Sequence, residues 1–244
     1  MTTPVDSKWL VMTELKCKRT GVAILSALGL SALAISFLIH IYGLDLRIAA
    51  ELHDLSMGEA GWMTGKASPW IKFYRYGEYP AVIMAVIAFV AFLFTKAGKL
   101  PVKFAKPCLV IVLTVILGPG LVVNGILKNF WGRPRPADTV LFGGTCPERG
   151  LADPGGPGAG KSFVCGHCAN AFAVASGVAL FPYFPGVAGL FLGAGLTFGA
   201  LGSFARMAQG AHYLSDAFWS GIIVLSIIVW LYFCVFKIPA LERD

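Results

Sequence analysis

The chain has 244 residues, of which 57% are hydrophobic and only 14% are charged, and its mean hydropathy is +0.72. This apolar content excludes an ordinary soluble globular domain. The formal net charge of +7 fits a membrane protein whose lysines and arginines follow its topology and contact lipid headgroups. We therefore expect the lipid bilayer, and not a nucleic acid, as its partner.

Six segments are long and apolar enough to cross a membrane as helices. They cover residues 21–42, 79–95, 107–127, 167–184, 186–205 and 213–236. The second and fourth segments are short, and the tight turn 182–185 that follows the fourth carries no charge. The sequence therefore predicts an all-α, polytopic membrane protein with six transmembrane helices, and we expect residues 1–244 to form a single domain.

The distribution of basic residues predicts the topology. An even number of spans places both termini on one side of the membrane. Lys16, Lys18 and Arg19 precede the first span, and four more lysines lie between the second and third spans: Lys96, Lys99, Lys103 and Lys106. Because cytoplasmic loops are enriched in lysine and arginine, both termini are predicted to be cytoplasmic.

Residues 43–78, between the first two expected spans, form an outer segment of mixed charge. Its first half has four aliphatic residues at helical spacing: Leu44, Ile48, Leu52 and Leu55. Aromatic residues crowd the stretch from Trp62 to Tyr79. This pattern predicts an interfacial helix with an aromatic belt, and a gate that admits lipid is the alternative.

The third expected span ends in LKNFWGRPRP, in which Lys128 precedes Arg135 and Pro136. Arginine binds phosphate oxygens as a fork and lysine binds them as a point charge. The prolines stiffen the backbone around Arg135. These residues are a candidate phosphate site, and the alternative is a basic helix cap that contacts lipid headgroups.

A glycine- and proline-rich loop follows and ends in GGPGAGKS, residues 155–162. This matches the pattern of a nucleotide-binding P-loop. We reject that interpretation because no β-strand is expected before the loop and no helix is expected to begin at Lys161.

The next stretch, Cys165-Gly166-His167-Cys168, opens the fourth span. Its spacing is also that of thiol–disulfide oxidoreductases, but such a motif normally belongs to a thioredoxin-like domain, for which this chain has no room. The favoured interpretation is that Gly166 and neighbouring backbone N–H groups bind an anion at a helix start, with His167 as a proton donor. A disulfide from Cys146 to Cys165 or Cys168 is a further hypothesis.

The last polar cluster lies between the fifth and sixth spans and contains Arg206, His212 and Asp216. If the last helix begins near Tyr213, His212 and Asp216 share one face of it. The Asp216 carboxylate would then accept a hydrogen bond from one imidazole nitrogen and leave the other free to attack. Arg206 would hold an anion beside that nitrogen. All three polar stretches are expected at the same membrane face.

At these residues the chain resembles the type 2 phosphatidic acid phosphatase superfamily of membrane lipid phosphatases. The pattern of that family is Lys-six residues-Arg-Pro, then Pro-Ser-Gly-His, then Ser-Arg-five residues-His-three residues-Asp. This sequence supplies Lys128, Arg135, Pro136, Gly166, His167, Arg206, His212 and Asp216. It departs where Val164 stands for the Pro, Cys165 for the first Ser and Ala205 for the second. The resemblance covers roughly residues 120–220.

The resemblance implies a phosphatase that works through a phosphohistidine. His212 would attack phosphorus, with Asp216 orienting it. His167 would protonate the leaving oxygen and later activate water. The remaining site residues would bind the phosphate: Lys128, Arg135, Arg206, Cys165 and Gly166. No metal and no other cofactor is implied.

The resemblance further implies a bacterial inner-membrane enzyme that acts on a membrane lipid phosphate at a periplasmic active site. The stretch GAHYLSDAFWSG favours removal of the 1-phosphate of lipid A. Undecaprenyl diphosphate phosphatase and phosphatidylglycerophosphate phosphatase are the alternatives. Outside the enzymes, the alternative is a transporter or a scaffold whose charged residues line a polar cavity.

Overall fold

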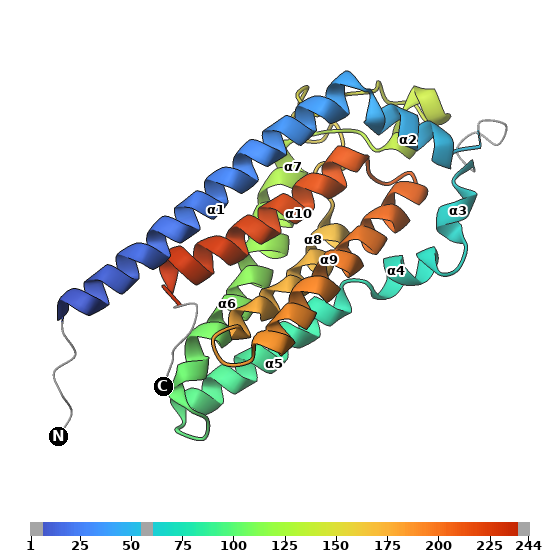
Figure 1. Ribbon diagram of the computed structural model, residues 1–244. Coiled ribbons are helices and arrows are strands. Elements are labelled where there is room, and N and C mark those ends of the chain that lie inside the picture. Colours follow the sequence, from blue (N-terminus) through green and yellow to red (C-terminus); the bar gives the residue numbers. More distant parts are fainter. Residues whose placement is uncertain (1–6, 55–60, 239–244) are drawn as a thin grey trace.

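The fold is an elongated bundle of helices (Figure 1), seen in a computed structural model that describes residues 7–54 and 61–238. Within these ranges the structure has helices and loops but no strand, apart from one isolated bridge between Thr139 and Cys146. The long helices are α1 (Ser7–Ile41), α5 (Tyr79–Lys96), α6 (Ala105–Val115), α9 (Pro185–Ala208) and α10 (Leu214–Val229). The prediction of an all-α protein is confirmed.

Shorter elements complete the bundle. The α-helical ones are α2 (Leu44–Leu52), α3 (Met63–Lys66), α4 (Trp70–Tyr76), α7 (Lys128–Phe130) and α8 (Gly166–Ala173). The 3₁₀ segments are η2 (Val102–Phe104), η4 (Pro136–Asp138), η5 (Val140–Phe142) and η6 (Val174–Leu180). The π-helical segments are η3 (Ile116–Leu127) and η7 (Trp230–Val235).

In the described part of the chain, five helical stretches are long and apolar enough to cross a membrane. They are Met12–Ile41, Trp70–Lys96, Val102–Phe130, Pro185–Ala208 and Leu214–Val235. The predicted fourth span corresponds to the shorter apolar helix Gly166–Leu180, which is formed by α8 and η6. Many large apolar side chains face outward, such as Leu30, 69% exposed, and Ile87, 64% exposed. In a bilayer this surface contacts lipid, so the chain is a multi-pass membrane protein.

Contacts between the first and last helical segments agree with a sixth crossing formed by α8 and η6. Lys237 Nζ lies 2.5 Å from Glu14 Oε2, and the Cys17 thiol donates to the Ile238 carbonyl at 3.7 Å. The start of α1 and the end of η7 therefore lie at one end of the bundle (Figure 1). Only an even number of crossings brings them there, which agrees with the predicted six helices.

The opposite end of the bundle carries α2, α3 and α4 (Figure 1). The predicted interfacial helix is α2, of nine residues; Leu55 lies outside the described residues. The aromatic residues that follow do not form one uniform belt. Trp62 is only 2% exposed and packs against His53 and Phe142, whereas Tyr76 is 58% exposed. Trp62 therefore belongs to a core cluster at the end of the bundle that carries α2–α4.

Small residues let the short fourth crossing pack closely against α9. A Cβ atom added to Gly195 would lie 2.2 Å from the backbone nitrogen of Ala175, where no side chain fits. Such close backbone approach is common where transmembrane helices pack through small residues. The contact holds η6, which continues α8 and its His167, against α9, which carries Arg206.

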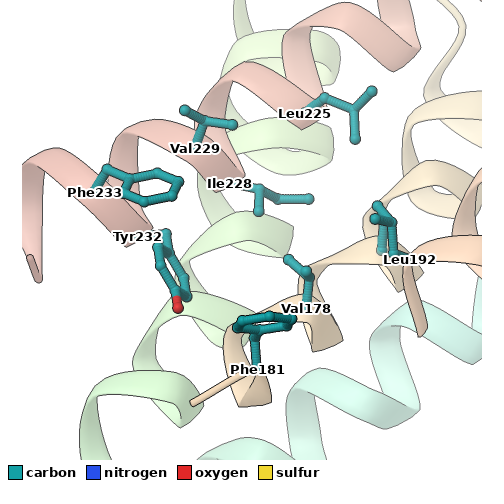
Figure 2. Close-up of a pocket in the computed structure, with 9 residues that line it drawn as sticks. Val178, Phe181, Leu192, Leu225, Ile228, Val229, Tyr232 and Phe233 are labelled. Atoms are coloured by element: carbon teal, nitrogen blue, oxygen red, sulfur yellow. The ribbon is translucent and has the colours of Figure 1, made fainter. Parts of the chain in front are cut away.

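An apolar cavity of about 280 Å³ lies among η6, α9, α10 and η7 (Figure 2). Its walls include Val178, Leu192, Leu225 and Phe233, and no charged side chain lines it. Leu225 lies nine residues beyond Asp216 along α10, which corresponds to about 14 Å of helix. The cavity is therefore remote from the polar cluster and cannot by itself bind a phosphate group.

Candidate active site

The polar residues singled out in the sequence gather at the end of the bundle that carries α2–α4. Lys128 begins α7, Gly166 begins α8, Arg206 lies in the last turn of α9, and His212 lies just before α10. The positive charges of Arg206, Lys128 and Arg135 all act on His212, and the same three charges act on His167. The structure thus brings the three predicted polar stretches together.

His212 lies in the turn between α9 and α10, with only 2% of its surface exposed. Its Nδ1 lies 2.6 Å from the carbonyl oxygen of Ser162, whereas Asp216 Oδ2 is 3.9 Å away. The last helix begins near Tyr213 as expected, but the predicted hydrogen bond between His212 and Asp216 is wrong, because Asp216 Oδ2 accepts from Ser162 and Tyr213 instead. A backbone carbonyl accepts the Nδ1 proton instead, which leaves Nε2 with a free lone pair.

The surroundings of His212 favour its neutral form. Burial is the main cause, and the positive charges of Arg206, Lys128 and Arg135 act in the same direction, so the pKa of His212 lies well below its ordinary value. A neutral imidazole with a free Nε2 is the form that can act as a nucleophile.

Asp216 acts on His212 through Ser162. The carboxylate is completely buried, and it accepts hydrogen bonds from the Ser162 hydroxyl at 2.5 Å and the Tyr213 N–H at 2.9 Å. The first bond fixes the residue whose carbonyl orients His212, and the second fixes the turn that carries His212. Asp216 thus positions the imidazole indirectly, through Ser162 and Tyr213.

Arg133 neutralises Asp216 from the other side. Its Nη1 donates to Asp216 Oδ1 at 2.7 Å and its Nη2 donates to Asp45 Oδ2 at 2.9 Å, while the side chain is only 1% exposed. Its guanidinium also lies 4.1 Å from the centre of the Tyr213 ring. Burial alone would lower the pKa of Arg133, but the two carboxylates outweigh it and raise that pKa.

Sequence reasoning missed this network. It chose Arg135 from the pair of arginines in GRPRP and gave no role to Arg133, Asp45 or Ser162. Ser162 even lies in the rejected P-loop match. The available signal was Arg133, a second arginine next to a membrane span. A charge that is buried there needs a partner of opposite charge, so a carboxylate could have been sought for it.

The three cations on the other side of His212 have few anionic partners. Lys128 Nζ donates to the Asn124 side-chain oxygen at 3.5 Å. Arg206 is 7% exposed, and its Nη1 donates to the side-chain oxygen of Gln209. The Nε of Arg206 is buried with no hydrogen-bond partner among the described residues. An oxyanion is the ligand that such a group of donors can bind.

The start of α8 supplies the second histidine. His167 is 24% exposed at its side chain, so it is more accessible than His212. A Cβ atom on Gly166 would lie 2.5 Å from the Asn124 side-chain oxygen, so this close approach requires glycine. The N–H groups of a first helical turn are free to bind an anion unless they are capped.

Comparison with known proteins gives the family. The model of the PAP2 superfamily matches residues 105–239, which include all three polar stretches. This chain belongs to the PAP2 superfamily. It is therefore a phosphatase-type hydrolase, as the sequence predicted.

The relatives found in the comparison are named for one activity. A "Lipid A 4'-phosphatase" of Francisella tularensis subsp. novicida is 30% identical over 191 residues, which is 74% of this chain and 81% of the relative. A protein of the same name from Rhizobium leguminosarum is 38% identical over 42% of this chain and 44% of the relative. A third, from Rhizobium etli, is 36% identical over 42% of this chain and 39% of the relative. No solved structure matches the chain significantly.

Within the PAP2 pattern, the departure at Cys165 has a structural consequence. Cys165 and Cys168 form a disulfide, and the Cys165 sulfur also accepts the Cys168 N–H at 3.2 Å. The hypothesis of a disulfide from Cys146 is wrong, since Cys146 is free. The Cys165 side chain has no hydrogen to donate to a phosphate, so only its backbone could do so.

Over residues 7–54 and 61–238, no group of three or more His, Cys, Asp and Glu side chains is arranged to hold an ion. The groups that could compensate a phosphate are the side chains of Lys128, Arg135 and Arg206.

The buried network gives a prediction about stability. Arg133→Met leaves Asp216 and Asp45 without their cation, and breaking a buried ion pair in this way costs about 3–5 kcal/mol. We expect a markedly lower thermal unfolding midpoint for the detergent-purified variant. Arg149→Met is the matched control, because Arg149 pairs with the exposed Asp153, and such pairs contribute about 0–1 kcal/mol. Equal midpoints for Arg133→Met and the parent would contradict a structural role for Arg133.

Proposed function

We propose that this PAP2 protein removes phosphate from a membrane lipid through a phosphohistidine on His212. One observation carries the proposal: the Nδ1 of a buried His212 is bound by the Ser162 carbonyl at 2.6 Å, so that Nε2 is free, within the field of three cations. This is the arrangement that in-line phosphoryl transfer needs, with a nucleophile on one side and charge compensation around the transferring oxygens.

The first half of the proposed reaction forms the covalent intermediate. The lone pair of His212 Nε2 attacks phosphorus, a P–N bond forms and the bond between phosphorus and the lipid oxygen breaks. Protonated His167 gives its proton to that oxygen, so the lipid leaves as an alcohol. Lys128, Arg135 and Arg206 bind the equatorial oxygens, whose charge is spread in the transition state.

The second half restores the enzyme. His167, now neutral, takes a proton from a water molecule as the water oxygen attacks phosphorus. The P–N bond breaks, the electron pair returns to His212 Nε2, and inorganic phosphate leaves. His167 is then protonated for the next turnover. Asp216 takes no proton in this scheme, because its oxygens accept from Ser162, Tyr213 and Arg133.

The substrate we propose is lipid A, with the 4'-phosphate as the group removed. The names of the three relatives support this choice, and the first of them is similar over most of both chains. The expectation of a 1-phosphatase from the sequence is not supported by these relatives. The apolar helices around the site agree with a substrate that stays in the bilayer while its phosphate reacts.

The two histidines give a test of the chemistry. His212→Ala should abolish formation of a ³²P-labelled, acid-labile and alkali-stable phosphoenzyme. His167→Ala should slow turnover about 10²- to 10⁴-fold with an alkyl phosphate, as removal of a general acid does. His40→Ala is the matched control, since His40 lies on α1 outside the site. Near-normal turnover of both site variants on a lipid phosphate would refute the assignment.

The same assay tests the role of the cations. Because the protein itself supplies three positive charges, we expect activity to persist in EDTA and vanadate to inhibit it. Loss of activity in chelator that added Mg²⁺ restores would show that the charge compensation comes from a metal instead.

The position of the phosphate gives the next prediction. Purified protein incubated with bisphosphorylated lipid A should release the 4'-phosphate and leave the 1-phosphate, as tandem mass spectrometry of the product would show. His212→Ala serves as the inactive control. Undecaprenyl diphosphate and phosphatidylglycerophosphate should be tested in parallel at equal concentration. Release of the 1-phosphate, or faster hydrolysis of either other lipid, would contradict the proposed substrate.

We further propose that the site faces the periplasm of a bacterial inner membrane and that both termini are cytoplasmic. The support is the cluster of lysines at the opposite end of the bundle, between α5 and α6. Ala152→Cys, beside the site loop, should react with a membrane-impermeant maleimide in intact spheroplasts. Ala97→Cys should react only after the membrane is opened. Both tests use a background that keeps Cys165 and Cys168, and the reverse labelling pattern would reverse the topology.

A further inference from the structure

Two side chains from outside the motif segments lie against His167. Tyr74 belongs to α4, and Glu78 is the residue that directly precedes α5. Both precede residue 105, where the match to the PAP2 superfamily begins. They are therefore features of this chain that the family pattern does not assign.

The Glu78 carboxylate lies on the Nδ1 side of His167. Its Oε1 is 3.6 Å from His167 Nδ1 and 3.4 Å from the Asn170 side-chain nitrogen. The same Asn170 nitrogen donates to the Gly166 carbonyl at 3.3 Å. Asn170 thus ties the carboxylate to the first turn of α8, the turn that carries His167.

The Tyr74 ring lies close to both His167 and Arg206. Its centre is 5.1 Å from the centre of the His167 ring, with 30° between the planes. The guanidinium of Arg206 lies 4.7 Å from the centre of the same tyrosine ring. One aromatic ring therefore contacts both His167 and Arg206 and limits how far either can turn.

The charges around His167 show why it needs a carboxylate. Arg206 from α9, Lys128 from α7 and Arg135 from the following loop all act on it, and Glu78 opposes them. A general acid must be protonated before it can donate, and neighbouring cations disfavour a protonated imidazole. The buried carboxylate of Asp216 and the partly exposed carboxylate of Asp45 are both already bound by Arg133.

We propose that Glu78 is a positioning residue for His167: its carboxylate holds the proton on Nδ1 and stabilises the imidazolium, so that Nε2–H points to the leaving oxygen. Tyr74 fixes the plane of the same ring. The inference rests on the proposed function of His167 as the general acid. Glu78 and Tyr74 both come from the α4–α5 segment. The position of that segment therefore determines whether the two side chains reach His167.

The test compares two phosphate monoesters, octyl phosphate with a poor leaving group and p-nitrophenyl phosphate with a good one. Glu78→Gln keeps the shape and removes the charge. We expect its kcat to fall about 10- to 100-fold on octyl phosphate and less than about 3-fold on p-nitrophenyl phosphate, because only the first reaction needs full protonation of the leaving oxygen. Glu51→Gln on α2 is the matched control and should change neither rate.

The pH dependence of kcat gives a second test. If Glu78 only supported the structure around His167, its loss would not shift the pH profile. Activity that needs protonated His167 is lost as pH rises, and the Glu78 carboxylate favours this protonated form by its opposite charge. The alkaline limb of the kcat profile on octyl phosphate should therefore move to lower pH in Glu78→Gln. It should stay in place in Glu51→Gln.

Tyr74 gives an independent variant. Tyr74→Phe keeps the ring and should retain activity within about twofold, whereas Tyr74→Leu should lose activity preferentially on octyl phosphate. Tyr76→Leu is its control, since Tyr76 is 58% exposed and its ring pairs with Tyr79 and not with His167.

The outcomes separate this inference from the proposed function. If the parent is active, two results overturn the role of Glu78. One is a Glu78→Gln variant with unchanged rates; the other is a variant that loses equal activity on both esters and keeps the alkaline limb of its pH profile in place. No hydrolysis of either ester or of lipid A by the folded parent overturns the proposed function, and the inference falls with it.

Discussion

The site depends on the buried ion pair between Arg133 and Asp216. Asp216 is fully buried, and its oxygens are bound by a guanidinium, a hydroxyl and a backbone N–H. A carboxylate can remain charged in such a place only because these partners replace water. Once fixed, it holds the Ser162 segment against the turn before α10, and this contact determines which nitrogen of His212 is free. His212 is thus oriented by a network that reaches Asp45 on α2.

The two arginines of GRPRP serve opposite sides of this arrangement. Arg135 has φ −74° and ψ 154°, which is close to polyproline II geometry. In extended backbone of this kind, side chains two positions apart can point in different directions. Arg133 enters the buried carboxylate network, while the charge of Arg135 acts on the histidines. The prolines that flank them keep this divergence rigid.

The sequence was sufficient to predict the helical class, the crossings and the convergence of the polar stretches. Long apolar runs have one stable structure in a bilayer, and charged residues at their ends are retained only where they function. The partner of His212 could not be predicted in this way, because it is a backbone carbonyl, a group that every residue possesses. The contact of Glu78 with His167 also depends on how segments far apart in sequence meet. Such meetings are set by packing, as at Gly195 and Ala175, and not by spacing within a motif. The Cys165–Cys168 disulfide, by contrast, joins two residues of one motif.

The short fourth crossing explains why the site suits a lipid. Gly166–Leu180 joins an α-helical part to a 3₁₀ part, and the two together extend about 26 Å, given rises of about 1.5 and 2.0 Å per residue. The hydrocarbon core of a bilayer is about 30 Å thick. If the last residues of this helix reach one surface of the hydrocarbon core, its first turn lies slightly below the opposite surface. His167 and the N–H groups of that turn then lie at the depth of lipid headgroups, where the long basic side chains at the ends of the neighbouring helices can also extend. A phosphate attached to a lipid would arrive at this depth without leaving the bilayer.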